Sequence, residues 1–206
     1  GFGGKIGDQK VCSFGDAATT SFFPAKPLGG YGDGGAVFTN DDDLADKLVS
    51  IRVHGNGSDK YDNIRVGING RMDSIQAAIV LAKLTIFDDE LILREKWANA
   101  YSNLLASTFQ LQKIPNSYSS AWAQYSLITD RKAHRDEVMS KLKNHGIPTM
   151  IYYPIPLHLQ TTFKHLNNRI GDYPVSEDIA NCIISIPMHP YLDDETINQI
   201  VSGLLD

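Results

Sequence analysis

The sequence lacks the features that mark membrane-spanning and nucleic-acid-binding proteins. Its longest uninterrupted apolar stretches run for about six residues, as in 77–82, whereas a bilayer-spanning helix needs about 18. Positive charge is not in excess, because 19 Lys and Arg are set against 24 Asp and Glu, for a net charge of −5. This balance excludes a generic nucleic-acid binder and electrostatic docking on anionic lipid. No signal-peptide pattern opens the chain, so we expect neither a membrane nor a nucleic-acid partner.

Cysteine is also scarce. Cys12 and Cys182 are the two cysteines, too few and too far apart for a disulfide framework, and they are typical of reduced thiols in a cytoplasmic protein. Neither Cys-x-x-Cys nor His-Glu-x-x-His occurs, so a structural zinc site is not expected. The acidic run 41–43 lacks the later glycine and glutamate of a calcium loop and is more typical of a helix N-terminus. We therefore expect no metal.

The composition is that of a globular protein. Of the 206 residues, 42% are hydrophobic and 21% are charged, which is usual for a chain that buries a core. This length suits one large domain or two small ones. The first five residues, Gly-Phe-Gly-Gly-Lys, have the chemistry of a turn and lack an initiating Met. We expect a fragment of a longer protein.

Apolar periodicity and capping residues predict alternating strands and helices. The predicted strands are 17–23, 35–39, 122–128 and 147–153; the predicted helices are 41–55, 74–106, 134–146, 176–182 and one capped by Asp193. Within 74–106 we expect one long helix, or two with a kink near Asp88 and Asp89. One apolar stripe should be its buried face, broken only at Glu90: Ile75, Ile79, Ala82, Ile86, Leu93, Trp97, Ala100 and Leu104. Residues 55–73 have no stable period and are expected to form a long ordered loop.

Lys26 is the most informative residue of the chain. It follows the strand at 17–23, stands between Pro24 and Pro27, and precedes a loop with many glycines. A lysine held in such an apolar turn would be partly desolvated, which lowers its pKa and frees its amine for Schiff-base chemistry. Ser21 and nearby backbone amides could hold a phosphate. Composition alone fits a surface lysine in a flexible loop better, while a Walker-type phosphate loop is excluded, since Gly-Lys-Ser or Gly-Lys-Thr is absent.

The segment 21–35 (SFFPAKPLGGYGDGG) closely resembles the cofactor-lysine segment of the DegT/DnrJ-type nucleotide-sugar aminotransferases. These are pyridoxal-phosphate enzymes of the aspartate-aminotransferase fold, fold type I. Further segments that resemble family signatures follow in the family's order over nearly the whole chain: 51–55 (IRVHG), 66–73 (VGINGRMD), 76–78 (QAA), 153–160 (YPIPLHLQ) and 185–190 (SIPMHP). One glycine-lysine motif would be a weak signal, but five further motifs in the family's order make it a strong one.

The resemblance implies roles for six residues. Lys26 would form a Schiff base with pyridoxal 5'-phosphate and then shuttle a proton to the substrate carbon. Ser21 would bind the cofactor phosphate. Asn69 would reach the phosphate bound to the other subunit of a homodimer, carried by an interface loop at 55–73. Arg71, Tyr153 and His158 would lie near the nucleotide sugar. A dehydratase branch of the family has histidine where this chain has Lys26, so transamination is favoured.

The resemblance also implies an α/β fold that is the C-terminal part of a fold type I enzyme. Residues 1–106 would be the rest of the large cofactor-binding domain with its long connecting helix, and 107–206 a small C-terminal α/β domain. The carboxylate that pairs with the cofactor's pyridine nitrogen and the aromatic residue that stacks on its ring precede this region in the family. We therefore expect the chain alone not to sustain catalysis.

The implied activity is amination of a keto group on a nucleotide-linked hexose, with glutamate as amine donor. Because 21–35 looks most like the branch for UDP-linked N-acetyl sugars, we expect such a substrate and a place in surface polysaccharide biosynthesis, including lipopolysaccharide. Two alternatives remain open: a non-catalytic family member that binds a ligand and regulates, and an inactive fragment without cofactor. Retention of Ser21, Lys26 and Asn69 argues against the first.

Overall fold

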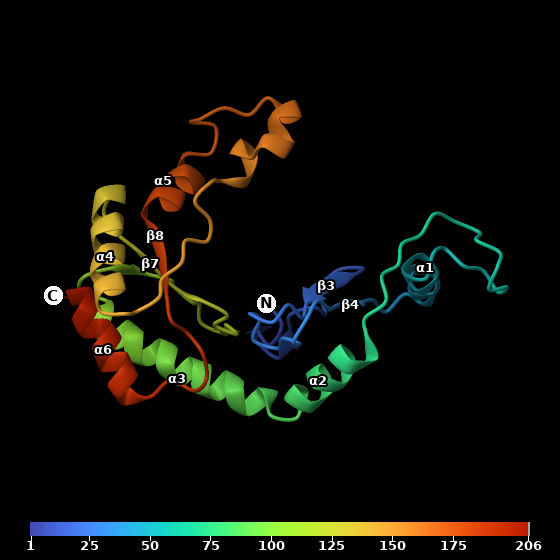
Figure 1. The fold of residues 1–206 in the computed structure, drawn as a ribbon, viewed down its shortest axis with the longest axis horizontal. Coiled ribbons are helices and arrows are strands. Elements are labelled where there is room, and N and C mark those ends of the chain that lie inside the picture. Colours follow the sequence, from blue (N-terminus) through green and yellow to red (C-terminus); the bar gives the residue numbers. More distant parts are fainter. Residues whose placement is uncertain (206) are drawn as a thin grey trace. The chain divides into compact units, whose positions relative to one another are not determined.

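The protein is described by a computed structural model that covers residues 1–205. It is a mixed α/β structure, which agrees with the expected partial fold type I. Its strands are β1 (Lys5–Ile6), β2 (Gln9–Lys10), β3 (Ala18–Ser21), β4 (Gly35–Phe38), β5 (Gln110–Leu111), β6 (Tyr118–Ser119), β7 (Tyr125–Ile128) and β8 (Ile183–Ile186). Its helices are α1 (Asp42–Arg52), α2 (Ser74–Leu84), α3 (Phe87–Leu105), α4 (Lys132–Asn144), α5 (Pro174–Cys182) and α6 (Asp194–Leu205), with 3-10 turns η1 (Leu157–Leu159) and η2 (Thr161–Leu166) (Figure 1).

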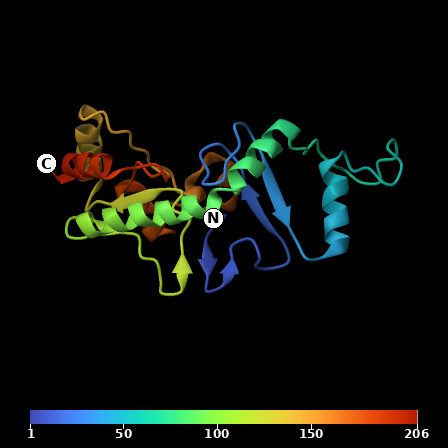
Figure 2. The same ribbon diagram turned by 90° about the horizontal axis from the view of Figure 1, so that it is seen from below.

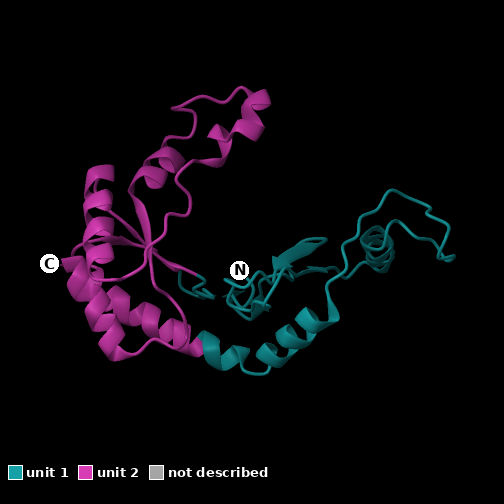
Figure 3. Ribbon diagram, viewed as in Figure 1, with its two compact units in different colours: residues 1–91, 115–123 teal, residues 92–114, 124–206 magenta. Residues whose placement is uncertain are grey.

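The chain divides into two compact units. Unit 1 comprises Gly1–Leu91 and Pro115–Ala123, and unit 2 comprises Ile92–Ile114 and Gln124–Asp206. The division falls inside α3, whose ribbon changes colour partway along in Figure 3. Within the described part of the chain, no helix is both long and apolar enough to cross a membrane.

Unit 1 contains two small antiparallel sheets. Strands β3 and β4 lie within the expected strands at 17–23 and 35–39. They pair antiparallel with Ser21 opposite Gly35 and lie side by side in Figure 2. A second sheet has the order β2-β1-β6, and its short strands were not predicted from the sequence. The core of the unit is built on Leu28, Val80 and Phe87, with partly buried apolar side chains around them. This core joins the segment after Lys26 to α2 and the start of α3.

Helix α1 forms where the sequence predicts it. The side chain of Asp41 accepts a hydrogen bond from the backbone N–H of Leu44 at 3.0 Å, which satisfies one of the free amides at the helix start. The segment 55–73 then folds back along the end of α1. Isolated bridges join Val53 to Asn69 and Asn56 to Asn63. The expected long loop is thus an ordered excursion held by backbone hydrogen bonds.

The predicted long helix is two helices. The break lies at residues 85 and 86, between α2 and α3, three residues before the expected kink. The predicted buried stripe is wrong in large part, because Ile75, Ile86 and Leu104 are exposed. The residues of α3 that are buried follow a different phase: Phe87, Glu90, Arg94, Trp97, Ala98, Tyr101 and Leu105. Because the helix is interrupted at residues 85 and 86, the regular helical spacing does not continue from α2 into α3. Apolar residues with helical spacing across both helices therefore do not lie on one face.

Unit 2 is an antiparallel sheet, β5-β7-β8, packed with α4 and α6. Val138 and Leu142 of α4 are buried, as are Ile197 and Ile200 of α6. Asp193 caps α6 by accepting from the backbone N–H of Thr196 at 2.8 Å.

Two predicted strands of the second half differ from the structure. Residues 147–153 are not a strand, and only Met150 makes a bridge, to Ser185. Pro148 explains the difference, because proline donates no hydrogen bond to a sheet. The strand expected at 122–128 begins only at Tyr125, since Trp122 has a φ of +44°, which does not fit an extended chain.

Candidate functional site

The turn that carries Lys26 starts at the end of β3. The Ser21 hydroxyl accepts a hydrogen bond from the backbone N–H of Phe23 at 3.1 Å, and the Lys26 N–H donates to the Phe23 carbonyl at 2.9 Å. The next residues are buried, with Leu28 only 3% exposed. Gly29 must be glycine, because a Cβ there would lie 2.6 Å from the Phe23 carbonyl oxygen. A tight, well-packed turn therefore sets the position of Ser21 and Lys26.

The Lys26 side chain is exposed, so the partial desolvation expected from its apolar neighbours is not found in this chain. The two flanking prolines shape the backbone but do not cover the amine. Among residues 1–205, no hydrogen bond or ion pair engages the Lys26 side chain. Its amine is consequently open to a ligand.

A second lysine near the same loop has a different environment. Lys83 of α2 donates through Nζ to the Gly29 carbonyl at 2.8 Å, and its Nζ lies 5.4 Å from the centre of the Tyr31 ring. Gln76, also on α2, accepts from the Tyr31 N–H at 2.8 Å. Helix α2 therefore contacts the glycine-rich loop at two points. The Lys83 amine is hydrogen-bonded to this loop, whereas the Lys26 amine has no hydrogen-bond partner within the described residues.

Asn69 and Arg71 form a pair of their own. Arg71 donates through Nε to Asn69 Oδ1 at 3.1 Å, and both side chains are exposed. Within the described residues, no hydrogen bond joins this pair to Ser21 or Lys26. The loop that carries the pair exposes apolar side chains, among them Ile64 at 56%, Val66 at 96% and Ile68 at 62%.

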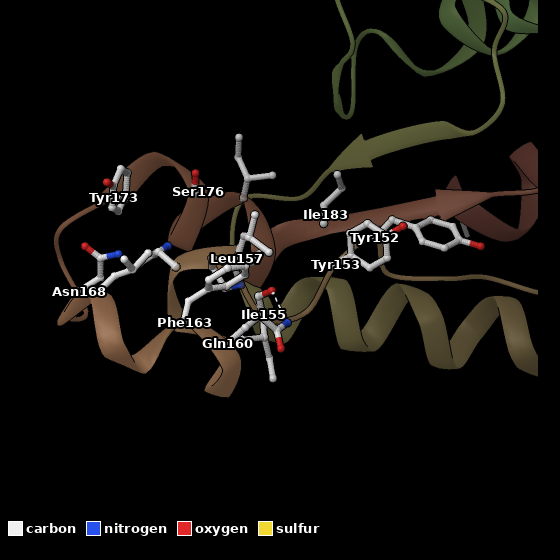
Figure 4. Close-up of a pocket in the computed structure, with 15 residues that line it drawn as sticks. Tyr152, Tyr153, Ile155, Leu157, Gln160, Phe163, Asn168, Tyr173, Ser176 and Ile183 are labelled. Carbon is white, nitrogen blue, oxygen red and sulfur yellow. Dashed lines mark hydrogen bonds between the residues drawn. The ribbon is translucent and has the colours of Figure 1, made fainter. Parts of the chain in front are cut away.

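Tyr153 and His158 lie together on one pocket of unit 2. The pocket has a volume of ≈ 810 Å³, and Figure 4 shows the side chains that line it. Its wall is largely aromatic and aliphatic: Tyr152, Tyr153, Ile155, Leu157, Phe163, Leu166, Tyr173 and Ile179 are among its lining residues. The Tyr152 and Tyr153 rings meet edge to face, with centroids 5.4 Å apart. Another hollow, of ≈ 930 Å³ over β3, β4 and α1, is lined by none of the six predicted site residues.

His158 is held by a carboxylate. Its Nε2 lies 3.0 Å from Oε1 of Glu177, and the two side chains are only 9% and 14% exposed. The Tyr173 ring packs against the imidazole, with centroids 4.7 Å apart. The backbone N–H of Gly171 and then that of Tyr173 hold the pKa of Glu177 below its usual range, assisted by His158. Glu177 is therefore ionised at neutral pH.

Glu177, Gln76 and Lys83 have no role that was predicted from the sequence. Acidic residues are common in the first turn of a helix, and Glu177 lies in the first turn of α5, which begins at Pro174. Its position in the sequence therefore did not indicate a contact with His158. Gln76 stands within one of the recognised segments, but its contact with Tyr31 crosses 45 residues. Contacts of this length become visible only in the fold. No group of three or more potential metal ligands occurs in the part of the chain that the structure describes.

Similarity in sequence and similarity in structure point to the same protein family. A sequence model of the DegT/DnrJ/EryC1/StrS aminotransferase family matches residues 1–205. The chain is 42% identical, over 98% of its length, to a Pseudomonas aeruginosa protein named UDP-2-acetamido-2-deoxy-3-oxo-D-glucuronate aminotransferase, and covers 55% of that protein. It is 40% identical, over 99% of its length, to a Geobacillus stearothermophilus protein named pleiotropic regulatory protein, again covering 55%.

A solved structure is similar over nearly the whole chain. It is a DegT DnrJ EryC1 StrS aminotransferase from Brucella abortus, with a TM-score of 0.94 and 46% sequence identity. The match covers 99% of this chain and 54% of that one. The chain therefore spans about half the length of the relatives that it matches.

Proposed function

Because the chain belongs to the DegT/DnrJ/EryC1/StrS aminotransferase family, we propose that the full-length protein transfers an amino group from an amino acid to the keto carbon of a nucleotide-linked sugar. The observation that carries the proposal is the unengaged Lys26 amine in the turn that follows β3. A transaminase of this kind needs a lysine whose amine is free to react, whereas Lys83 is bound to the Gly29 carbonyl.

The family depends on pyridoxal 5'-phosphate, and the side chains of unit 1 fit this group chemically. When bound, the cofactor supplies an aldehyde that condenses with amines and a conjugated ring that accepts electrons. Lys26 offers the amine for the aldehyde. The Ser21 hydroxyl and the Asn69 amide offer hydrogen bonds suited to a phosphate. No carboxylate for the pyridine nitrogen is assigned within the described residues.

Each residue would have its own role once the cofactor is bound. Lys26 would hold the cofactor through its amine and, with that amine free, would move a proton to and from the substrate carbon that receives nitrogen. Ser21, on the tight turn after β3, would hydrogen-bond the phosphate. We propose that the loop 55–73 lies at a homodimer interface, where Asn69 and Arg71 reach the cofactor phosphate and the sugar nucleotide of the other subunit. The exposed Ile64, Val66 and Ile68 support this interface.

Tyr153 and His158 are proposed to contact the sugar nucleotide, and their shared pocket supports this. The proposed substrate is a UDP-linked N-acetyl hexose, since the 42% identical relative is named for a UDP-2-acetamido-2-deoxy-3-oxo sugar. Glutamate is the proposed amine donor. We place the reaction in the cytoplasm, in the synthesis of surface polysaccharide such as lipopolysaccharide.

A regulatory role without catalysis is the second candidate. The observation in its favour is that the 40% identical relative is named a pleiotropic regulatory protein. The two candidates differ in one measurable respect, because a regulator need not turn over a keto sugar. Retention of an unengaged Lys26 favours the enzyme.

The test uses the full-length protein loaded with pyridoxal 5'-phosphate. Borohydride reduction followed by proteolysis and mass spectrometry should find the cofactor on the peptide that contains Lys26, and a label on Lys83 would overturn the assignment. The unreduced protein should aminate a member of a panel of nucleotide keto-sugars with glutamate. Lys26→Ala should lower the rate by several powers of ten, while Lys47→Ala, at an exposed position of α1, should leave it unchanged. Labelling without turnover of any sugar would favour the regulator.

A further inference from the structure

The Glu177 carboxylate is the point at which three segments of unit 2 meet. Both of its oxygens accept from the Gly171 N–H at 2.9 Å, and Oε1 also accepts from the Tyr173 N–H at 3.3 Å. The same Oε1 lies 3.0 Å from His158 Nε2. The carboxylate thereby ties η1, the loop before α5, and α5 itself into one wall of the pocket that holds Tyr153 and His158.

This contact fixes which nitrogen of His158 carries the proton. An ionised carboxylate only accepts hydrogen bonds, so the ring nitrogen that faces it must be a donor. Nε2 therefore bears hydrogen, and in the neutral ring Nδ1 is the bare nitrogen. Nδ1 has no hydrogen-bond partner within residues 1–205. It is the ring atom left for a ligand.

We propose that Glu177 is a positioning residue that locks His158 in the Nε2-protonated form, so that Nδ1 accepts a hydrogen bond from a hydroxyl or N–H group of an uncharged part of the ligand. The lining of the pocket supports an uncharged part, because it includes no Lys, Arg, Asp or Glu. A diphosphate would lose water there without gaining a cation. The identity of the ligand as a nucleotide sugar rests on the proposed function, whereas the state of His158 does not.

Two variants of Glu177 test the contact. In Glu177→Gln the side-chain oxygen can take the place of Oε1 and still accept from Gly171, Tyr173 and His158 Nε2, so hydrogen should stay on Nε2. Glu177→Met keeps much of the side-chain volume but offers no carboxylate acceptor, so Nε2 loses the partner that holds its hydrogen, and part of the neutral ring should carry hydrogen on Nδ1 instead. The matched control is Asp178→Asn, which removes a carboxylate at the neighbouring residue, whose side chain is exposed.

The measurement is nitrogen NMR of the full-length protein labelled with ¹⁵N in histidine, recorded about two units above the ordinary histidine pKa of about 6.5. The resonances of His158, assigned with a His158→Gln variant, should show hydrogen on Nε2 in the wild type, in Asp178→Asn and in Glu177→Gln, and a share of the Nδ1-protonated form in Glu177→Met. An Nδ1-protonated wild type, or an unchanged tautomer in Glu177→Met, would overturn the proposal. Retained protection of the α5 amides from hydrogen exchange shows that the wall has stayed folded. If that protection is lost in Glu177→Met, the wild-type tautomer alone decides the question.

The ligand class is tested on the same resonances. Adding UDP-N-acetylglucosamine to the wild type should shift the Nδ1 signal of His158, and inorganic pyrophosphate should leave it unchanged. A shift with pyrophosphate, or none with the sugar nucleotide, would overturn the assignment of an uncharged ligand group. Neither result depends on turnover. A protein that aminates no sugar would therefore refute the proposed function and leave the tautomer result standing.

Discussion

Gln76 holds Tyr31: the Tyr31 N–H donates to the Gln76 side-chain oxygen at 2.8 Å. The bond joins α2 to the glycine-rich loop that follows Lys26. Gly30 and Gly32 let the glutamine approach, since a Cβ at either position would lie 3.0–3.1 Å from its side-chain amide. The position of the loop after the proposed cofactor lysine therefore depends on a residue from another helix.

Removing this contact should loosen the loop. In Gln76→Ala the Tyr31 amide loses its acceptor, a change that is worth roughly 0.5–1.5 kcal/mol. Hydrogen exchange at Tyr31 should become up to about tenfold faster, because 1.4 kcal/mol is a factor of ten. Gln112→Ala, at an exposed position, is the control and should leave Tyr31 unaffected. Equal exchange rates in both variants would mean that the loop is held without Gln76.

The exposed apolar side chains Ile64, Val66 and Ile68 of the loop 55–73 should govern self-association. Val66 is 96% exposed, and a charge there would have to be desolvated in a subunit interface. Val66→Glu should shift the full-length protein from dimer to monomer in sedimentation equilibrium. Ser58→Glu adds the same charge at an exposed position of the same loop. If both variants sediment as the wild type does, the loop is not the interface.

Arg135 should be a stabilising residue of unit 2. It is 5% exposed, and its Nη1 donates to the Ala180 carbonyl at 3.0 Å, which joins α4 to α5. Arg135→Met keeps much of the volume but leaves that carbonyl unpaired, at a cost of about 1–3 kcal/mol. The midpoint of urea unfolding should fall accordingly.

Arg131→Met is the control for this change. Arg131 reaches Asp130 only at 3.7 Å, and its side chain is 62% exposed, so the control should change stability by less than about 1 kcal/mol. Equal losses in the two variants would show that burial of Arg135 contributes little.

Tyr101 should limit stability in alkali. Burial, and then the nearby Tyr125, raise its pKa above the ordinary value of the phenol. The unfolded chain loses this proton near pH 10, while the folded chain keeps it, so the unfolded state binds fewer protons and stability falls as the pH rises above about 10. Tyr101→Phe should flatten that fall between about pH 10 and 12, measured as the change in urea midpoint with pH. Tyr61→Phe, whose side chain is 86% exposed, should keep the wild-type slope.

Local signals in the sequence predicted local structure well. One helix cap was predicted at Asn40 or Asp41 and another at Asp193; in the structure Asp41 and Asp193 make the capping bonds. A cap depends on the side chain and an amide three residues later, so the sequence contains all that is needed. Helix α4 was predicted from its apolar positions and from Gly146, which adopts a φ of +72° just beyond the helix end.

Predictions that depended on distant contacts did less well. The buried face of α3 includes Glu90 and Arg94, which no hydrophobic pattern would select. The Glu177–His158 contact spans 19 residues of sequence, across segments without regular period. Ser21, Lys26, Asn69, Arg71, Tyr153 and His158 came from resemblance to a family, because residue type and spacing alone could not distinguish Lys26 from a surface lysine. Their roles stay predictions.

The sheet β2-β1-β6 has a consequence for synthesis on the ribosome. Lys5 of β1 pairs with Ser119 of β6. The ribosome therefore makes the partner of β1 more than a hundred residues after β1 itself. At about 5–20 residues per second, this delay is roughly 5–20 s. Within the residues that the structure describes, β1 and β2 form only a hairpin of two-residue strands until β6 is made, and such a hairpin is too short to persist alone in water. Unit 1 therefore completes this sheet only after all of α3 has been made.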